Sequence, residues 1–213
     1  MPNNKLAKLL TDTLTPGLNL FNPWHDRCDD DMPCDGPDAR LARLAAHLNC
    51  KPKFILCGEA PSHRGCRHSG IAFTSECQLL AGEIPRISKM NGRLTIRDKP
   101  YSERSATVVW DELRKLRIKE STILWNALPM HPHEKEKPHS NRTPRSEEIK
   151  KGKPALERLL REFPSATVIA VGRKAERSLK SMGVCAEYVR HPAHGGEAKF
   201  RQKLKRLVSG QSA

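Results

Sequence analysis

The sequence contains no long apolar run. No segment approaches the roughly 20 consecutive apolar residues that a membrane-spanning helix needs. Residues 1–20 contain no continuous apolar stretch of the signal-peptide kind. These absences predict a cytoplasmic protein with no membrane-bound part.

Acidic residues are too few to balance the basic ones. The chain has 38 Lys and Arg residues against 24 Asp and Glu residues, which gives a formal net charge of +14. A surplus of this size is typical of proteins that bind a polyanion, and it makes nucleic acid the leading partner. A generally basic surface without such a partner is the alternative, because net charge bears on association and not on fold.

The sequence also has no C-x-x-C pair, although it contains seven cysteines. An odd number of isolated cysteines, several of them inside apolar runs, favours reduced thiols over a disulfide framework. Three histidines of one loop, His131, His133 and His139, look like a zinc site only when taken alone, because no fourth ligand is evident. We therefore expect neither a metal nor a cofactor.

The most informative stretch is FILCGEAPSHRGCRHSGIAFTSE at residues 54–76. Its apolar start has the length of a strand and stops at Gly58, which predicts a buried strand that runs into a loop. Polar and cationic residues follow in this loop, namely Glu59, Ser62, His63, Arg64, Arg67 and His68. Ligands of open α/β sheets bind at the carboxyl ends of the strands. The stretch therefore predicts a pocket for a flat ligand with polar edges that is surrounded by phosphates.

Predicted strands and helices alternate along the chain. Apolar runs predict strands at residues 54–57, 122–126, 167–172 and 186–190. Apolar residues at helical spacing predict helices at residues 38–49, 77–87, 102–116, 145–162, 173–182 and 197–208. This alternation predicts a three-layer α/β/α sandwich with a central, mainly parallel sheet of four strands. We expect one domain, residues 1–213, in which residues 1–37 form an irregular N-terminal arm pinned by Leu18, Leu20, Phe21 and Trp24.

Three stretches resemble motifs of the uracil-DNA glycosylase superfamily. They are GEAPSHRGCRHSGIAFTSE at residues 58–76, ILWNALP at residues 123–129 and RHPAHGG at residues 190–196. Each lies at the end of a predicted strand, and together they follow the order of the family across nearly the whole chain. The sequence is most similar to a bacterial branch without an iron–sulfur cluster, because the segment after Asn126 has no Cys where cluster-containing relatives carry one.

The resemblance implies an enzyme that flips uracil out of DNA and hydrolyses its N-glycosidic bond, leaving an abasic site in base excision repair. The implied partner is uracil-containing DNA, single- or double-stranded, bound by a monomer that needs no cofactor. The three motifs contain no lysine, which favours a monofunctional glycosylase over one with a Schiff-base lyase step. Two alternatives stay open. One is a glycosylase for other deaminated or mismatched bases, such as hypoxanthine or thymine opposite guanine, and the other is a non-catalytic protein that binds uracil or abasic sites.

The resemblance also assigns a base pocket. The substrate-binding residues that it implies are Gly58, Ala60, Pro61, Ser62, Phe73 and Asn126. In this assignment Phe73 stacks on the flipped base. The amide of Asn126 accepts from uracil N3–H and donates to O4, a pattern that cytosine reverses. Taken alone, Phe73 reads as a core residue and Asn126 as a turn residue at a strand end.

His191 is the implied catalytic residue, because a hydrogen-bond donor at uracil O2 stabilises the charge that develops as the glycosidic bond breaks. Its alternative is a surface histidine in a turn. Relatives often carry Asp or Asn at the position of Ala60 to activate water. We prefer Glu76 for this role and place Glu59 second. The alternative for Glu76 is a solvated acid at a helix N-terminus.

Ser62 is small where the best-known branch of the family has a bulky Tyr that shuts out the thymine methyl group. Exclusion of bases substituted at C5 therefore comes from elsewhere in this chain or is weaker.

The candidate phosphate contacts are Arg64, Arg67, Lys199 and Arg201, with solvent-facing charges as the alternative. Arg190, His194 and Gly195 occupy the loop that in relatives wedges into the minor groove. This chain has no Leu there, so we expect His194 to do that work with help from Arg190.

Overall fold

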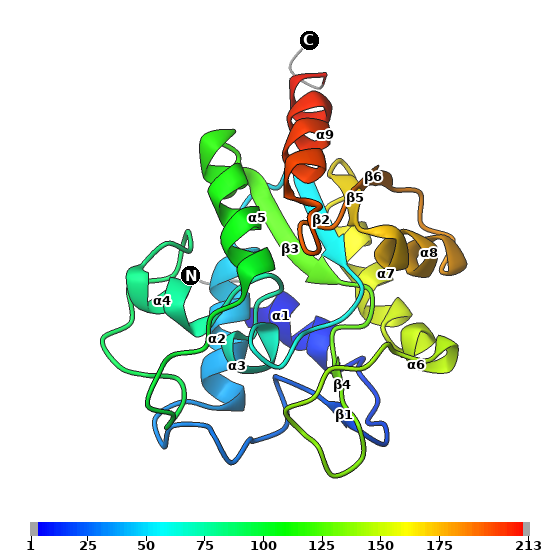
Figure 1. Ribbon diagram of the computed structural model, residues 1–213. Helices are drawn as coiled ribbons and strands as arrows, with labels where there is room; N and C mark the ends of the chain where they lie inside the picture. Colours follow the sequence, from blue (N-terminus) through cyan, green and yellow to red (C-terminus); the bar gives the residue numbers. More distant parts are fainter. Residues whose placement is uncertain (1–3, 211–213) are drawn as a thin grey trace.

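The computed structural model of the chain describes residues 4–210 (Figure 1). Its main sheet has four parallel strands, β2 (Phe54–Gly58), β3 (Thr122–Asn126), β5 (Thr167–Val171) and β6 (Glu187–Val189). They lie in the order β3-β2-β5-β6. The predicted parallel sheet of four strands is confirmed.

The sheet is buried on both faces. Successive side chains of β2 point in opposite directions, so that Ile55 and Cys57 belong to one core and Phe54 and Leu56 to the other. Every residue of β2 and β3 is buried. A strand covered on both sides needs no polar face, which explains why these segments read as unbroken apolar runs.

Helices form the outer two layers. The first core packs against α1 (Asn4–Thr11), α2 (Pro37–Leu48), α7 (Lys153–Glu162) and α8 (Arg173–Ser181). The second core packs against α5 (Arg104–Lys115) and α9 (Glu197–Ser209). The predicted three-layer α/β/α arrangement is therefore confirmed (Figure 1).

The remaining elements are short. They are β1 (Leu20–Phe21), α3 (Cys66–Ser69), α4 (Glu76–Ala81), the 3-10 helix Lys119–Ser121, β4 (His131–Pro132) and α6 (Ser146–Lys151). Strands β1 and β4 pair antiparallel and tie the N-terminal segment to the loop after β3.

The prediction of an irregular arm over residues 1–37 is wrong for α1, whose Leu6 and Leu10 are buried in the first core. Residues 1–3 lie outside the described part of the chain. Three of the four expected anchors, Leu20, Phe21 and Trp24, are buried, and the Trp24 ring stacks on Trp125 with 5.8 Å between centroids. Leu18 is 82% exposed and anchors nothing.

Two predicted helices differ from their expected bounds. The helix predicted over residues 77–87 stops at Ala81, because Gly82 takes a left-handed conformation that caps it. The helix predicted over residues 145–162 is divided into α6 and α7. Pro154 lies in the first turn of α7 and has no N–H with which to continue the hydrogen bonding of α6.

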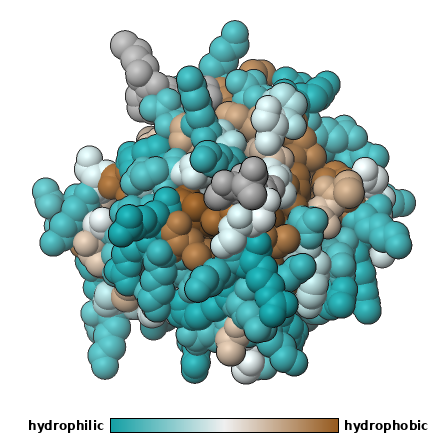
Figure 2. Space-filling view, turned by 90° about the horizontal axis from the view of Figure 1, so that it is seen from above, coloured by the Kyte–Doolittle hydropathy of each residue, from teal (hydrophilic) through white to brown (hydrophobic). Residues whose placement is uncertain are grey.

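The end of the molecule from which α9 projects is mainly hydrophilic, with hydrophobic residues showing between the polar ones near the middle of this face (Figure 2). The exposed side of α9 is basic, with Lys199, Lys203, Lys205 and Arg206 all exposed. Among residues 4–210 there is no helix with both the length and the apolar character of a membrane span.

Candidate active site

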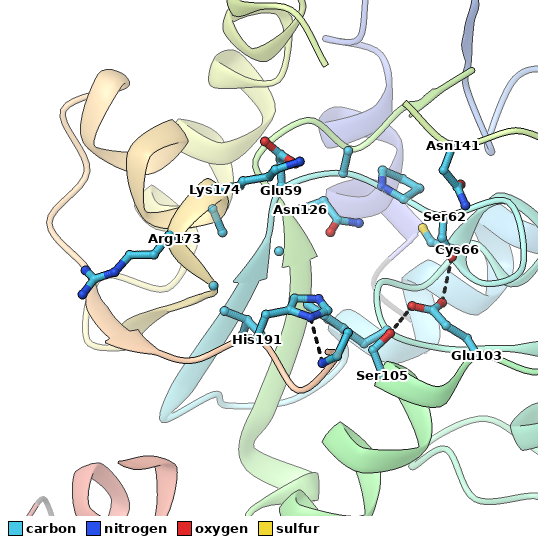
Figure 3. A pocket seen from close by; sticks show the side chains of 18 of the residues that line it. Glu59, Ser62, Cys66, Glu103, Ser105, Asn126, Asn141, Arg173, Lys174 and His191 are labelled. Carbon is cyan, nitrogen blue, oxygen red and sulfur yellow. Dashed lines mark hydrogen bonds and ion pairs between the residues drawn. The ribbon is translucent and has the colours of Figure 1, made fainter. Parts of the chain in front are cut away.

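The carboxyl ends of the four strands meet at one edge of the sheet. Gly58 at the end of β2 lies beside Asn126 at the end of β3. The N–H of Gly172, just after β5, donates to the carbonyl of Val189 at the end of β6 over 2.8 Å. A cavity of about 450 Å³ opens at this edge and is called the base pocket below (Figure 3).

All three motifs contribute to the base pocket. Ten predicted site residues line it, namely Gly58, Glu59, Ala60, Pro61, Ser62, Phe73, Asn126, Arg190, His191 and His194. The structure thus brings together side chains that are up to 136 residues apart in the sequence, from Gly58 to His194.

Asn126 offers a free amide to the pocket. Its side chain is only 4% exposed, and within residues 4–210 no side chain or backbone group hydrogen-bonds to that amide. Figure 3 shows the amide near the centre of the pocket. The amide is therefore open to the pocket, where a ligand with matching polar atoms can hydrogen-bond to it.

Phe73 lies both in the second core and in the pocket wall. Its φ of 50° places a bulky residue in the left-handed region, which costs free energy and is typical of functional sites. The centroid of its ring lies 6.3 Å from that of His191. The ring is therefore placed to form one side of a slot for a planar ligand.

His191 is held as a neutral hydrogen-bond donor. Its Nδ1 atom accepts the backbone N–H of Ala193 at 3.1 Å, so the ring proton lies on Nε2. Burial, with smaller contributions from the neighbouring Arg190 and His194, lowers the pKa of His191 to about 4. At neutral pH the imidazole is uncharged.

Two carboxylates line the pocket. Glu59 is half-buried; burial raises its pKa, and the Lys174 ammonium, 4.0 Å away, opposes that rise. Glu103 is also half-buried, and its pKa is raised by burial against the effect of the hydroxyl groups of Ser105 and Ser62, which hydrogen-bond to it. Figure 3 shows the two carboxylates on opposite sides of Asn126.

Glu76 does not line the pocket, which contradicts the preference for it as the water-positioning residue. Its carboxylate is fully buried at the start of α4. It accepts hydrogen bonds from Arg93 at 2.7 Å and from the hydroxyl of Thr95 at 2.8 Å, and three backbone N–H groups add to these. A carboxylate with every lone pair engaged has none left for a reacting water.

Two expected phosphate contacts are already engaged by other protein groups. Arg67 is buried, with its guanidinium over the ring of Phe21 at 3.7 Å and bonded to His131 at 3.0 Å. Arg201 forms ion pairs with Asp111, Glu112 and Glu197. Both arginines stabilise the fold.

The other cations and the wedge loop are accessible. Arg64, Lys199 and Arg190 are exposed, as are His194 and Gly195, and Arg190 and His194 also line the mouth of the pocket.

Several pocket residues were not predicted from the sequence. They are Cys66, Glu103, Ser105, Asn141, Arg142, Arg173 and Lys174. Arg173 and Lys174 directly follow β5, so the rule about carboxyl ends of strands could have found them. Glu103 lies just before α5, far from the ends of the strands in the sequence, and no local pattern distinguishes it.

One group of side chains among the described residues could in principle hold a metal ion, namely Cys28, Asp31 and His68. The group is already neutralised by arginines. Arg40 donates to Asp31 at 2.8 Å, and Arg67 donates to Cys28 at 3.5 Å. Two guanidinium groups beside the same donors oppose a cation, so these residues do not fit a metal site.

A parallel α/β sheet that gathers a free amide, a neutral imidazole and an aromatic ring at its carboxyl edge is typical of proteins that bind a small planar ligand at that edge.

The comparisons with known proteins agree with this class. The family model of the uracil DNA glycosylase superfamily matches residues 45–209, so the chain belongs to that superfamily and is a DNA glycosylase. The chain is similar in fold to the crystal structure of wild-type Pedobacter heparinus SMUG2. The TM-score is 0.65 at 14% sequence identity, over 100% of this chain and 97% of the other. No curated protein matches the sequence.

Proposed function

We propose that this DNA glycosylase is a monofunctional uracil-DNA glycosylase that acts as a monomer in base excision repair, on single- or double-stranded DNA. The observation that carries the proposal is the pairing, in one pocket, of a free Asn126 amide with an Nε2–H donor on His191. Uracil presents an N3–H donor beside two carbonyl acceptors, and this edge matches the two side chains.

In the proposed complex the flipped uracil stacks on Phe73. The Asn126 amide accepts from N3–H and donates to O4, and His191 donates from Nε2 to O2. With cytosine, the amide oxygen would face the acceptor N3 and the amide N–H would face the donor N4. Each group left without a hydrogen bond costs about 1–3 kcal/mol. The preorganised donor at O2 acts most strongly in the transition state, because negative charge gathers there as the bond breaks.

Hydrolysis then proceeds in two steps. The bond between C1′ and N1 breaks, and its electron pair leaves with uracil as an anion. Water adds to the cationic C1′ and gives one proton to Glu59, the pocket carboxylate next to Lys174 and the second candidate from the sequence for this role. Burial raises the pKa of Glu59, which favours proton uptake.

A glycosylase with lyase activity needs an amine nucleophile, and the lysine that lines the pocket is Lys174. Its Nζ lies 4.0 Å from the Glu59 carboxylate. An ammonium group paired with a carboxylate is not a nucleophile, so no Schiff base with the sugar is expected. Borohydride reduction during turnover therefore traps no covalent complex with DNA. A trapped complex that disappears in Lys174→Ala would make the enzyme a glycosylase with lyase activity.

The deciding experiment measures abasic-site formation on a labelled oligonucleotide with one uracil, both single- and double-stranded. We expect cleavage by the parent and a loss of about 100-fold or more in His191→Ala, the size typical of one lost transition-state donor. His25→Ala is the matched control, because His25 is 78% exposed and lies outside the pocket. Uracil-dependent binding by the parent without cleavage would instead identify a lesion-binding protein.

A further inference from the structure

One wall of the base pocket is built around a carboxylate that the proposed reaction does not use. The hydroxyl of Ser62 donates to Glu103 Oε2 at 2.9 Å, and the hydroxyl of Ser105 donates to Oε1. Ser62 comes from the loop after β2, and Ser105 from the first turn of α5. These three residues, Ser62, Glu103 and Ser105, are called the acidic wall.

The acidic wall is fitted closely into the loop. A Cβ atom at Gly65 would overlap Glu103 Oε2 and would lie 3.1 Å from the Ser62 hydroxyl. The carboxylate of Glu103 thus occupies the space that a side chain at this position would take. The position of Glu103 is therefore determined by the packing of two separate segments.

The carboxylate keeps unused acceptor capacity that faces the pocket. Among the described residues Glu103 has no ion pair, and its hydrogen-bond partners are the two serine hydroxyls. An ionised carboxylate has roughly four acceptor sites, so about two remain for water or for a ligand. Two nearby arginines in the sequence, Arg64 and Arg104, line a separate groove and not the base pocket.

The acidic wall faces the edge of the base that the other pocket residues leave free. In the proposed complex N1 bears the sugar, O2 meets His191, and N3 and O4 meet Asn126. Only C5 and C6 remain. Figure 3 shows Ser62 and Glu103 on the side of Asn126 away from Glu59 and Lys174, across the pocket from them.

We propose that Glu103, positioned by Ser62 and Ser105, determines specificity by selecting against a methyl group at C5 of the base. This inference rests on the proposed function. A methyl group against the acidic wall displaces water from the carboxylate and offers no hydrogen bond in return, whereas the C5–H of uracil leaves room for that water. The polar wall thus takes the place of a bulky side chain, which explains how a residue as small as Ser62 is compatible with selection of uracil. A C5 substituent that carries a hydroxyl group would donate to the carboxylate and be accepted.

The test compares single-turnover cleavage of uracil, thymine and 5-hydroxymethyluracil, each opposite guanine, by the parent, Glu103→Ala and Glu103→Gln. We expect the preference of the parent for uracil over thymine to fall about 10-fold or more in Glu103→Ala, the range of one discriminating contact. Cleavage of uracil itself is expected to change much less. In Glu103→Ala the cleavage rate of 5-hydroxymethyluracil relative to that of uracil is expected to fall by a similar factor, because its hydroxyl group loses the Glu103 acceptor.

Glu103→Gln keeps the shape of the side chain and tests whether charge is needed, so we expect an intermediate preference. Glu112→Gln, on the helix that begins directly after Glu103 but outside the base pocket, is the control for general effects on α5. Thermal unfolding of every variant shows whether it is folded. An unchanged preference in folded Glu103→Ala and Glu103→Gln would overturn the inference, as would an equal loss of activity on uracil and thymine.

Binding of the same oligonucleotides, followed by fluorescence anisotropy, separates this inference from the proposed function. If the parent cleaves no uracil, the proposed function is wrong. The affinity ratio between uracil and thymine oligonucleotides then decides the role of Glu103. A ratio that falls in Glu103→Ala supports the inference, and a ratio that stays unchanged contradicts it.

Discussion

The Nδ1 atom of His191 accepts a hydrogen bond from the backbone N–H of Ala193, two residues later in the same turn. This contact fixes the proton of the imidazole on Nε2, the nitrogen proposed to face uracil O2. Protonation of Nδ1 would set two N–H groups against each other, so the turn itself favours the neutral ring, in the same direction as burial.

The first prediction is that His191 stays neutral far below the usual range of histidine. With a pKa of about 4 in the folded protein, its NMR signals are expected to shift near pH 4 and not near pH 6.5. The unfolded chain takes up the proton first as the pH falls, so this residue destabilises the fold by about 1.4 kcal/mol per pH unit between pH 6.5 and about 4.

The measurement is an NMR titration of the imidazole Hε1 signals from pH 8 to below pH 4, with His191→Gln to assign the signal. Urea unfolding at pH 7 and pH 5 provides the second readout. The free energy of unfolding is expected to fall less between these two pH values in His191→Gln than in the parent. A midpoint near 6.5 for this signal would contradict the proposed tautomer and its role.

The second prediction distinguishes the roles of Glu76 and Glu59, the two candidates from the sequence for water activation. Glu76→Gln is expected to lower the free energy of unfolding by about 3 kcal/mol or more, because it breaks a buried pair with Arg93 and sets amide hydrogens against backbone donors. The activity of the molecules that remain folded is expected to stay close to that of the parent. Glu59→Gln is expected to show the reverse, with stability retained and single-turnover cleavage reduced.

Urea unfolding and cleavage under single-turnover conditions distinguish these outcomes. A Glu76→Gln variant with the stability of the parent but no activity would return the water-positioning role to Glu76.

The contrast between Glu59 and Glu76 shows which features can be predicted from the local sequence and which cannot. Strands β2, β3 and β5 were predicted within a residue, because burial on both faces leaves an apolar run that can be read locally. The resemblance to the uracil-DNA glycosylase motifs singled out Asn126 and His191, and both lie at the ends of strands, where ligands of such sheets bind.

The errors concern partners that lie far away in the sequence. Glu76 reads as an exposed acid at a helix start until the polar segment that contains Arg93 and Tyr101 folds over it. Arg67 reads as a phosphate contact until Phe21 and His131 enclose it. Glu103 enters the pocket through its hydrogen bond to Ser62, 41 residues away. None of these pairings leaves a periodic signal.

The third prediction concerns the close approach of the motif loop to the base-reading residues. A Cβ atom at Gly58 would lie 2.5 Å from Asn126 Oδ1 and 2.8 Å from Phe73 Cζ. Gly58→Ala is therefore expected to push both side chains into the base pocket, and the open pocket limits the loss of stability to about 1–3 kcal/mol. Uracil cleavage is expected to fall much further than this loss explains.

Gly92→Ala is the matched control, because a Cβ atom there meets no neighbour within 4 Å. Thermal unfolding and single-turnover cleavage of both variants provide the comparison. Full activity in Gly58→Ala would show that the Asn126 amide and the Phe73 ring do not need their present positions.

The fourth prediction is that exposed cations bind the DNA backbone and that paired ones do not. Arg64, Arg190 and Lys199 have no ion pair or side-chain hydrogen bond among the described residues, whereas three carboxylates surround Arg201 and raise its pKa. Each phosphate contact releases counterions, so its loss lowers the slope of log K against log salt by about 0.9 for duplex DNA. Substitution of each exposed cation by Ala is therefore expected to weaken binding and flatten this slope. Arg201→Ala is expected to lower stability and leave the slope nearly unchanged.

Fluorescence anisotropy titrations of a uracil duplex between about 50 and 200 mM salt measure these slopes, in the range where several phosphate contacts change affinity by orders of magnitude. Urea unfolding of the same variants assigns the stability effect. The division between paired and free cations would be wrong if Arg201→Ala gave the largest change of slope. It would also be wrong if none of the three exposed positions changed the slope, because the charge surplus of the chain would then contribute nothing at the mouth of the base pocket.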